Sequence, residues 1–154
     1  MARLHIASWR AAYRNELPAH YLDALDEGQR SEYWRARLQE SLRIILAEQA
    51  RDLLGFCAHG PARGMSDLTS AWEIYALHVS PELRGSGIGS VLFAEAVSAA
   101  RAARSAHLAL WVLATNSGAR RFYEAKGMQA DGVAQQRAPA QDVTLHEVRY
   151  SSSL

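Results

Sequence analysis

The chain has 154 residues, of which 49% are hydrophobic and 21% charged, and a formal net charge of +1. This length suits one domain with a single core, expected over residues 1–150 with a tail at 151–154, and the near-neutral charge gives no reason to expect nucleic acid as a partner. One cysteine, Cys57, excludes an internal disulfide and a cysteine-rich zinc site, and the lack of a signal-peptide pattern or a membrane-length apolar stretch favours a cytoplasmic protein with no membrane or metal partner.

Helical spacing of apolar residues dominates the first forty positions. We expect helices over residues 3–16, from Pro18 onward, and over residues 29–40. Two strand-like segments, residues 42–47 and 53–59, then flank a polar turn and are expected to form a hairpin.

The segment 60–70 carries proline, glycine and several polar residues, so we expect a mobile loop. Its Asp67 could attract a cationic amine.

The second half of the chain alternates strands and helices. A strand at 71–79, a helix at 87–104 and an apolar strand at 107–113 form a βαβ unit, so the two strands should be parallel. The helix should pack an apolar stripe on the sheet, made of Ile88, Leu92, Ala96, Ala99 and Ala103.

A further helix at 116–126 and two strands at 128–133 and 143–150 should follow, with Ser151–Ser153 as a frayed tail. The pattern predicts an α/β fold around a mixed sheet.

The turn between the first parallel strand and its helix reads Arg84-Gly85-Ser86-Gly87-Ile88-Gly89. Glycines lack a Cβ, so the backbone can turn tightly and point its N–H groups outward, and the positive end of the following helix lies beside them. A diphosphate is the natural ligand of such a turn, although the same pattern also occurs in simple connections.

Two known phosphate motifs do not fit this turn. A dinucleotide fingerprint needs a third glycine where Ser90 stands, and an acidic residue near the end of the next strand, which residues 108–113 lack. A P-loop needs a lysine after the last glycine, whereas the chain's one lysine is Lys126. The remaining pattern is Arg-x-x-Gly-x-Gly.

A second motif follows about thirty residues later, as Asn116-Ser117-Gly118-Ala119-Arg120-Arg121-Phe122-Tyr123-Glu124-Ala125-Lys126-Gly127-Met128. Together with the glycine turn, in this order and spacing, it resembles the GNAT superfamily of acyl-CoA-dependent N-acetyltransferases, with Met128 in place of the usual phenylalanine. The resemblance is specific over Glu73–Met128 and looser over Ser8–Leu25. It implies a central mixed sheet whose parallel strands splay apart, and acetyl-CoA as a consumed acyl donor.

The resemblance also implies which residues hold the cofactor. Backbone groups of Leu77, His78 and Val79 should line the pantetheine arm like an added strand. Asn116 can cap its helix, touch the cofactor, or do both. The expected pyrophosphate-binding residues are Arg84, Gly85, Ser86, Gly87, Ile88 and Gly89.

Two residues are the implied catalytic groups. Tyr123 would protonate the leaving thiolate, because a phenol of reference pKa about 10 is well matched to that task; the alternative is a packing role on an amphipathic helix. Glu73 would take the amine proton if burial raises its pKa, and the alternative is a carboxylate that meets only solvent or an arginine. His78 is a second candidate base, although its side chain should point to the opposite face from Leu77 and Val79.

The implied acceptor is a small-molecule or peptide amine. The aromatic residues of the N-terminal part either line its pocket or belong to the core; they are Trp9, Tyr13, Tyr21, Tyr33 and Trp34.

The sequence departs from the resemblance at its start, because no strand is expected before the helix at residue 3; the alternatives are a late start, a truncation, or a sheet edge completed differently, for example by a partner chain. A sheet edge left open in this way would favour a homodimer. The expected activity is N-acetyl transfer; the alternatives are a non-catalytic CoA-binding or sensor module and a nucleotide-binding regulator.

Overall fold

Six strands form one mixed sheet in the computed structural model, which describes residues 1–40 and 42–154. The strand order is β1-β2-β3-β4-β6-β5, and every neighbouring pair is antiparallel except β3 and β4. This confirms the predicted mixed sheet with its parallel pair. The strands are β1 (Arg43–Gln49), β2 (Asp52–Pro61), β3 (Ala71–Val79), β4 (His107–Leu113), β5 (Gln129–Ala140) and β6 (Val143–Ser153).

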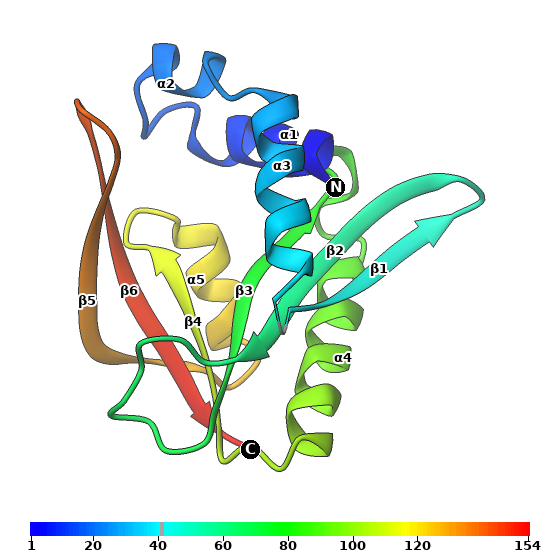
Figure 1. Cartoon of the computed structure of the whole chain (residues 1–154), viewed down its shortest axis with the longest axis vertical. Coiled ribbons are helices and arrows are strands. Elements are labelled where there is room, and N and C mark those ends of the chain that lie inside the picture. Colours follow the sequence, from blue (N-terminus) through cyan, green and yellow to red (C-terminus); the bar gives the residue numbers. More distant parts are fainter. Residues whose placement is uncertain (41) are drawn as a thin grey trace.

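Helices cover both faces of the sheet (Figure 1). The first three gather at one end of the molecule, where they bury Leu4 and Trp34 against β1, β2 and β3. The last two pack on the opposite face, over a core that contains Leu92 and Tyr123. The helices are α1 (Ala2–Tyr13), α2 (Ala19–Asp23), α3 (Glu27–Leu38), α4 (Ile88–Ala102) and α5 (Ser117–Glu124), with a 3₁₀ turn at Pro81–Leu83.

Helix α4 approaches the sheet closely because its buried stripe contains small residues. Leu92, Ala96 and Ala100 are almost fully buried, and Phe93 packs beside them. The expected stripe is correct at its start and wrong at its end, where Ala100 takes the buried position predicted for Ala103. The step of four residues keeps Leu92, Ala96 and Ala100 on one face of the helix.

The end of the chain belongs to the sheet. Ser151–Ser153, expected as a frayed tail, are the last residues of β6 and pair with Ala109, Leu108 and His107 of β4. Backbone hydrogen bonds to β4 therefore order this segment, although its serine side chains had suggested a frayed end. Strand β5 also runs to Ala140 rather than ending at 133, and as an edge strand it tolerates proline.

Strands β3 and β4 pair over only part of their length. The pairs run from Ala71 with His107 to Ile74 with Leu110, after which both strands continue without pairing to each other. The register between β2 and β3 shifts at the same level. Ala58 of β2 pairs with Ala76 and the next residue, His59, pairs with Ile74, so β3 has one extra residue, Tyr75, at this point. Such a bulge bends its strand, so β3 turns away from β4 and opens a gap at their carboxyl ends.

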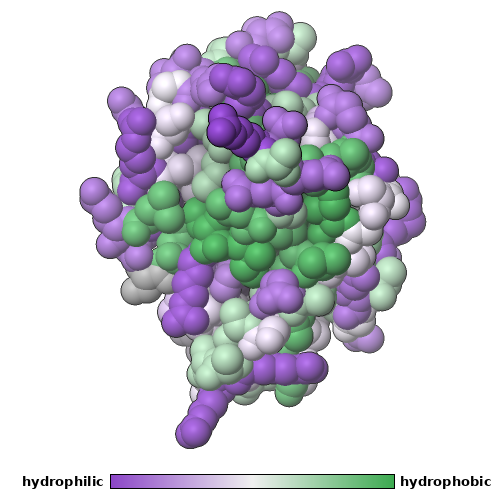
Figure 2. Space-filling view, turned by 90° about the vertical axis from the view of Figure 1, so that its right-hand side faces the viewer, coloured by the Kyte–Doolittle hydropathy of each residue, from purple (hydrophilic) through white to green (hydrophobic). Residues whose placement is uncertain are grey.

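An apolar band crosses the face that carries the β1–β2 hairpin and α4 (Figure 2). Two apolar side chains of these elements are exposed: Leu46 on the edge strand β1 and Val91 on α4, at 47% and 62%. Throughout the described ranges, no helix is both long and apolar enough to cross a membrane.

Candidate functional site

A cleft of about 1280 Å³ opens where β3 and β4 separate. One side of the cleft is formed by the end of β3, the glycine turn, the end of β4 and helix α5. The other side is formed by the N-terminal helices and the β5–β6 hairpin. Parallel strands commonly place ligands outside their carboxyl ends, where helix N-termini also point. The cleft lies at that position, between the starts of α4 and α5.

The register of β3 decides which backbone groups face the cleft. Ser80 donates its N–H to the Leu54 carbonyl of β2 at 2.8 Å. Because backbone groups alternate along a strand, those of His78 also face β2, where Phe56 is its partner. The N–H and C=O groups of Leu77 and Val79 therefore face the gap toward β4, and no strand of the described chain pairs with them there.

The glycine turn adopts the backbone shape that its sequence requires. Gly85 and Gly87 have φ angles of +82° and +90°, which residues with a Cβ rarely adopt. Gly89 has no such angle, and a Cβ there would meet Val79 and Phe122 at ordinary contact distances of 3.6 and 3.7 Å.

Four N–H groups of this turn are free to bind a ligand. Among the residues that the structure describes, the N–H groups of Gly85, Gly87, Ile88 and Gly89 have no hydrogen-bond partner, whereas that of Ser86 is bonded to Leu83. The first N–H groups of a helix lack partners within the helix, and together with its dipole they favour an anion. The turn is thus a preformed anion cradle.

Two of the predicted cofactor residues connect the cleft to α1. Arg84 donates to the carbonyl of Ser8 at 3.3 Å. The side-chain oxygen of Asn116 accepts from Ala119 N–H at 3.0 Å, and its amide donates to the Tyr13 hydroxyl at 3.0 Å. The predicted helix cap is confirmed, and the second bond fixes α1 over the start of α5.

Tyr123 lies on the inner face of α5 and lines the cleft. Its ring packs among Phe93, Phe122 and Tyr150, and within the described ranges its hydroxyl has no hydrogen-bond partner. Burial raises the pKa of the Tyr123 hydroxyl well above its usual range. The phenol is therefore neutral, and its proton is available to a group in the cleft.

Helix α5 is held on the sheet by a polar contact at its other end. Tyr150 of β6 donates its hydroxyl to Glu124 at 2.6 Å and accepts from Arg120 at 3.1 Å. Since Tyr150 is fully buried, this contact sets how α5 lies on β6 and hence where Tyr123 points.

Glu73 lies in β3 just before the strands separate, and it lines the cleft although it is only 6% exposed. Its Oε2 accepts the N–H of Arg63 at 3.1 Å and lies 3.7 Å from the Arg63 guanidinium. Burial nevertheless raises the pKa of the Glu73 carboxyl, with Arg63 acting in the opposite direction. The carboxyl is therefore buried with a raised pKa, the condition set for a base, and it also meets an arginine, as the alternative expected.

His78 points to the face opposite Leu77 and Val79, as predicted. Its Nδ1 lies 3.1 Å from the Ser8 hydroxyl, and its ring stacks on His5 at a centroid distance of 4.4 Å. Burial, assisted by Arg30, lowers the pKa of His78 to about 4. This imidazole is neutral and is turned toward α1.

The β5–β6 hairpin contributes charged residues to the cleft that sequence reasoning missed. Buried Glu147 accepts from Gln135 at 2.7 Å and from Arg137 at 2.8 and 2.5 Å. The sequence did carry a signal, because Glu147 and Arg149 continue the inward-facing alternation begun by two apolar residues of β6. Charged residues at such positions need partners.

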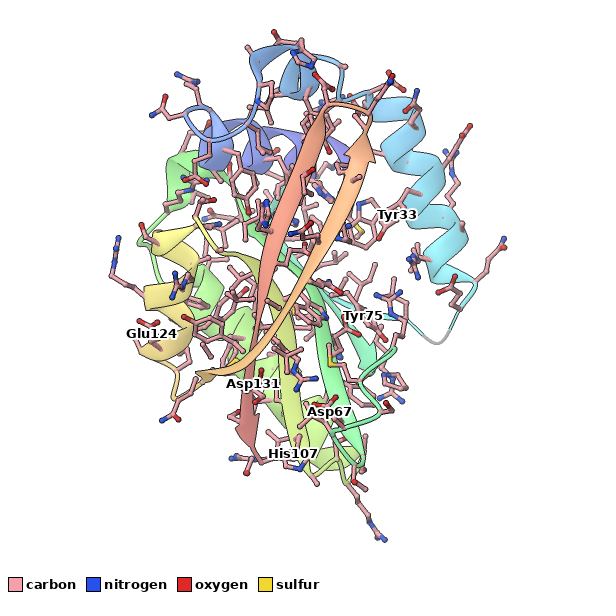
Figure 3. All side chains as sticks on the ribbon, turned by 90° about the vertical axis from the view of Figure 1, so that its left-hand side faces the viewer. Tyr33, Asp67, Tyr75, His107, Glu124 and Asp131 are labelled. Carbon is pink, nitrogen blue, oxygen red and sulfur yellow. The ribbon has the colours of Figure 1, made fainter. Side chains whose placement is uncertain are left out.

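Arg149 finds its partners on two other segments. Its guanidinium binds Asp67 of the loop before β3 and Asp131 of β5, the latter at 2.6 Å (Figure 3). Asp67 is therefore occupied within the protein, contrary to its expected role of attracting a cationic amine. Met65, which is 5% exposed, anchors the same loop in the interior.

Some aromatic residues of the N-terminal helices belong to the core, and all of those named above also line the cleft. Tyr13 and Trp34 are buried, yet all five line the cleft. Tyr33 is 41% exposed and lies on the side of α3 that faces the β5–β6 hairpin (Figure 3). His107 lies at the far end of β4, away from the cleft.

A family model, a relative and two solved structures that resemble this chain are all described as acetyltransferases. A family model described as the acetyltransferase (GNAT) family matches residues 7–128. The N-acetyltransferase YuaI of Bacillus subtilis, itself uncharacterized, is 25% identical over 96% of this chain and 83% of its own length.

Two solved structures share the fold. A ribosomal-protein-alanine N-acetyltransferase from Brucella melitensis superposes with a TM-score of 0.71 at 22% identity, covering 99% of this chain and 94% of the other. The PaiA N-acetyltransferase from Thermoplasma acidophilum, in complex with coenzyme A, gives 0.75 at 16% identity, covering 99% and 90%.

Proposed function

The chain belongs to the acetyltransferase (GNAT) family, and we propose that it transfers an acetyl group from acetyl-CoA to a primary amine by direct attack in a ternary complex. One observation carries this proposal. The cleft between β3 and β4 combines an anion cradle, two unpaired strand positions and a neutral phenol in a single cavity. These are the groups needed to hold a diphosphate, an amide-containing arm and a leaving thiolate.

The cofactor contacts follow from the backbone. The free N–H groups of Gly85, Gly87, Ile88 and Gly89 would bind the pyrophosphate, as helix N-termini bind phosphates. The amide groups of the pantetheine arm would pair with Leu77 and Val79 as an added strand. Asn116 supports this arrangement by capping α5, because both polar groups of its side chain are already engaged.

The leaving group needs a proton, and Tyr123 supplies it. The amine nitrogen attacks the thioester carbonyl, the carbon–sulfur bond breaks, and the thiolate takes the phenolic proton. Burial raises the pKa of Tyr123, so the phenol carries its proton over the working pH range; it is also a weaker acid than a free phenol, and it would give up that proton only as negative charge develops on the sulfur in the same desolvated cleft. The proton released as the amide forms restores the phenol.

The attacking amine must first lose a proton, and Glu73 is the base we assign. Burial raises the pKa of this carboxyl toward the working range, while Arg63 acts in the opposite direction and favours the ionised form. His78 is a weaker candidate because its imidazole is directed to Ser8 and His5.

Two measurements test this function. Calorimetric titration with acetyl-CoA should show saturable binding in the micromolar range, and thiol release in the presence of amines should depend on both substrates. Binding without release for any amine would identify a non-catalytic CoA-binding module. The absence of acetyl-CoA binding would contradict the proposal as a whole.

A further inference from the structure

The charged residues that line the cleft are predominantly positive. Six arginines and three glutamates line it, and among the described residues no lysine or aspartate does. Arg84 and Arg121 come from the glycine turn and α5, at the cofactor end. The arginines of the opposite end come from α3, from the loop after β2 and from β5: Arg30, Arg37, Arg63 and Arg137.

Protein groups already neutralise the buried carboxylates at this end. Glu73 contacts the backbone and guanidinium of Arg63, and Glu147 forms a two-pronged pair with Arg137. The third carboxylate, Glu16, is exposed beyond the end of α1. No buried carboxylate is left unpaired in the described part of the cleft to bind a second positive charge.

Two arginines of α3 have positive charges that no buried carboxylate of the described chain neutralises. Arg30 and Arg37 lie on either side of Tyr33, with guanidinium carbons 5.3 and 5.4 Å from its ring centroid. Both are half-buried, and across the described chain Arg30 has no ion-pair partner, while Arg37 meets only Glu40, whose side chain is 56% exposed. Their position on one helix face follows from the spacing of three and four residues.

The field of these arginines reaches into the cleft. Arg30 contributes to the lowered pKa values of His5 and His78, behind the larger effect of burial. At Glu73 and Tyr75 burial raises the pKa, and Arg37 opposes that effect, as Arg63 does more strongly. An oxyanion near Tyr33 would thus meet two cations in a partly desolvated site, where charge-assisted hydrogen bonds are strong.

We propose that the acceptor amine carries an oxyanion, a carboxylate or a phosphate, and that Arg30 and Arg37 bind this group while the amine faces Glu73. The inference rests on the proposed acetyl transfer and specifies its acceptor class. It disfavours polyamines and other polycationic amines, because they would be repelled by unpaired Arg30 and by Arg37, whose one partner, Glu40, is exposed to solvent.

Matched amine pairs test this proposal. Thiol release is measured with amino acids against their carboxamides, with phosphoethanolamine against ethanolamine, and with spermidine. We expect turnover of an anionic member and at least a tenfold lower kcat/KM for its neutral counterpart. The amino-acid and phosphoethanolamine arms distinguish a carboxylate from a phosphate. A preference for carboxamides, ethanolamine or spermidine would overturn the proposal.

Variants on α3 locate the site. For the preferred anionic acceptor, Arg30→Gln and Arg37→Gln should each raise KM about 10- to 100-fold with a smaller change in kcat. The control is Arg35→Gln, because Arg35 is exposed on the same helix and does not line the cleft. An unchanged KM in both variants, or an equal change in the control, would overturn the assignment.

A binding experiment separates this inference from the transfer reaction. The same anionic and neutral amines are added to the enzyme with CoA bound, and the unfolding temperature is recorded. Stabilisation by anionic compounds that Arg30→Gln abolishes supports the site even if no amine is acetylated. If no anionic amine stabilises the protein while CoA does, the acceptor inference fails and the cofactor assignment stands.

Discussion

The two ends of the cleft differ in what they offer a ligand. At the cofactor end, the groups that face the cavity are mainly backbone N–H and C=O groups of the glycine turn and β3. At the acceptor end they are side chains from α1, α3, β5 and β6, which are far apart in the sequence. Backbone groups suit a cofactor whose structure is always the same, because they do not depend on residue type. Side chains can differ between proteins of one fold, and the acceptor can differ with them.

The largest expected effect tests the chemical step between the two ends. Tyr123→Phe removes the proton donor and keeps the ring that packs on Phe93 and Phe122, so kcat should fall by about 100-fold or more. Steady-state thiol release gives kcat, and calorimetry should show unchanged acetyl-CoA binding. A kcat within threefold of the parent would remove Tyr123 from the mechanism.

The pH dependence of kcat tests Glu73. The deprotonated carboxylate is the active form, so activity is present above the folded pKa, which lies above 4.5, and is lost as the pH falls through it. Glu73→Gln should lower kcat by about 100-fold and abolish this acidic limb, whereas Glu73→Asp should keep the limb at reduced rate. An identical profile in Glu73→Gln would show that another group takes the proton.

Substitution of a glycine in the turn tests how the cofactor end binds acetyl-CoA. A residue with a Cβ in the left-handed region costs about 1–2 kcal/mol, so Gly87→Ala should either strain the turn or reshape it, and acetyl-CoA affinity should fall about tenfold. The control is Gly118→Ala, where φ is not positive and the nearest atom lies at 3.7 Å. Equal affinities in the two variants would contradict a role for the shape of the turn.

The smallest effect on activity is expected at Arg149, which joins three segments outside the cleft. Arg149→Gln should lower the free energy of unfolding by about 1–3 kcal/mol, since Asp131 loses its guanidinium partner, while acetyl-CoA affinity stays the same. Urea denaturation measures the first and calorimetry the second, with the exposed Arg104→Gln as the control.

The other ion pair of Arg149, with Asp67, gives a pH signature. The Arg149 guanidinium lowers the pKa of Asp67 below 3.8, so its contribution to stability is complete above that value and is lost as the pH falls through the lowered pKa. The stability difference between Arg149→Gln and the parent should therefore shrink in acid. A difference that stays constant down to the acid transition would mean that packing, and not charge, explains it.

Sequence alone predicted the shape of the glycine turn and the start of α5, because the requirements of both are local. Gly85 and Gly87 stand where the backbone needs positive φ, and Asn116 stands where a helix begins, so each residue reveals its own geometry. The parallel pair β3–β4 followed from strand and helix spacing for the same reason.

The acceptor end could not be predicted, because its meaning depends on partners distant in sequence. Asp67 looked like a free acidic residue in a loop, since its partner Arg149 lies 82 positions away. Glu147 and Arg30 gain their roles only when β6 and α3 face the same cavity. Ser151–Ser153 looked disordered because the strand that orders them, β4, begins over forty residues earlier.

A crystal structure with a non-hydrolysable thioether analogue of acetyl-CoA tests the central claim most directly. We expect the pyrophosphate on the free N–H groups of the glycine turn, the pantetheine arm along Leu77 and Val79, and the sulfur beside the Tyr123 hydroxyl; the free N–H groups are those of Gly85, Gly87, Ile88 and Gly89. An analogue bound outside the gap between β3 and β4, or with its sulfur out of hydrogen-bonding reach of Tyr123, would contradict it.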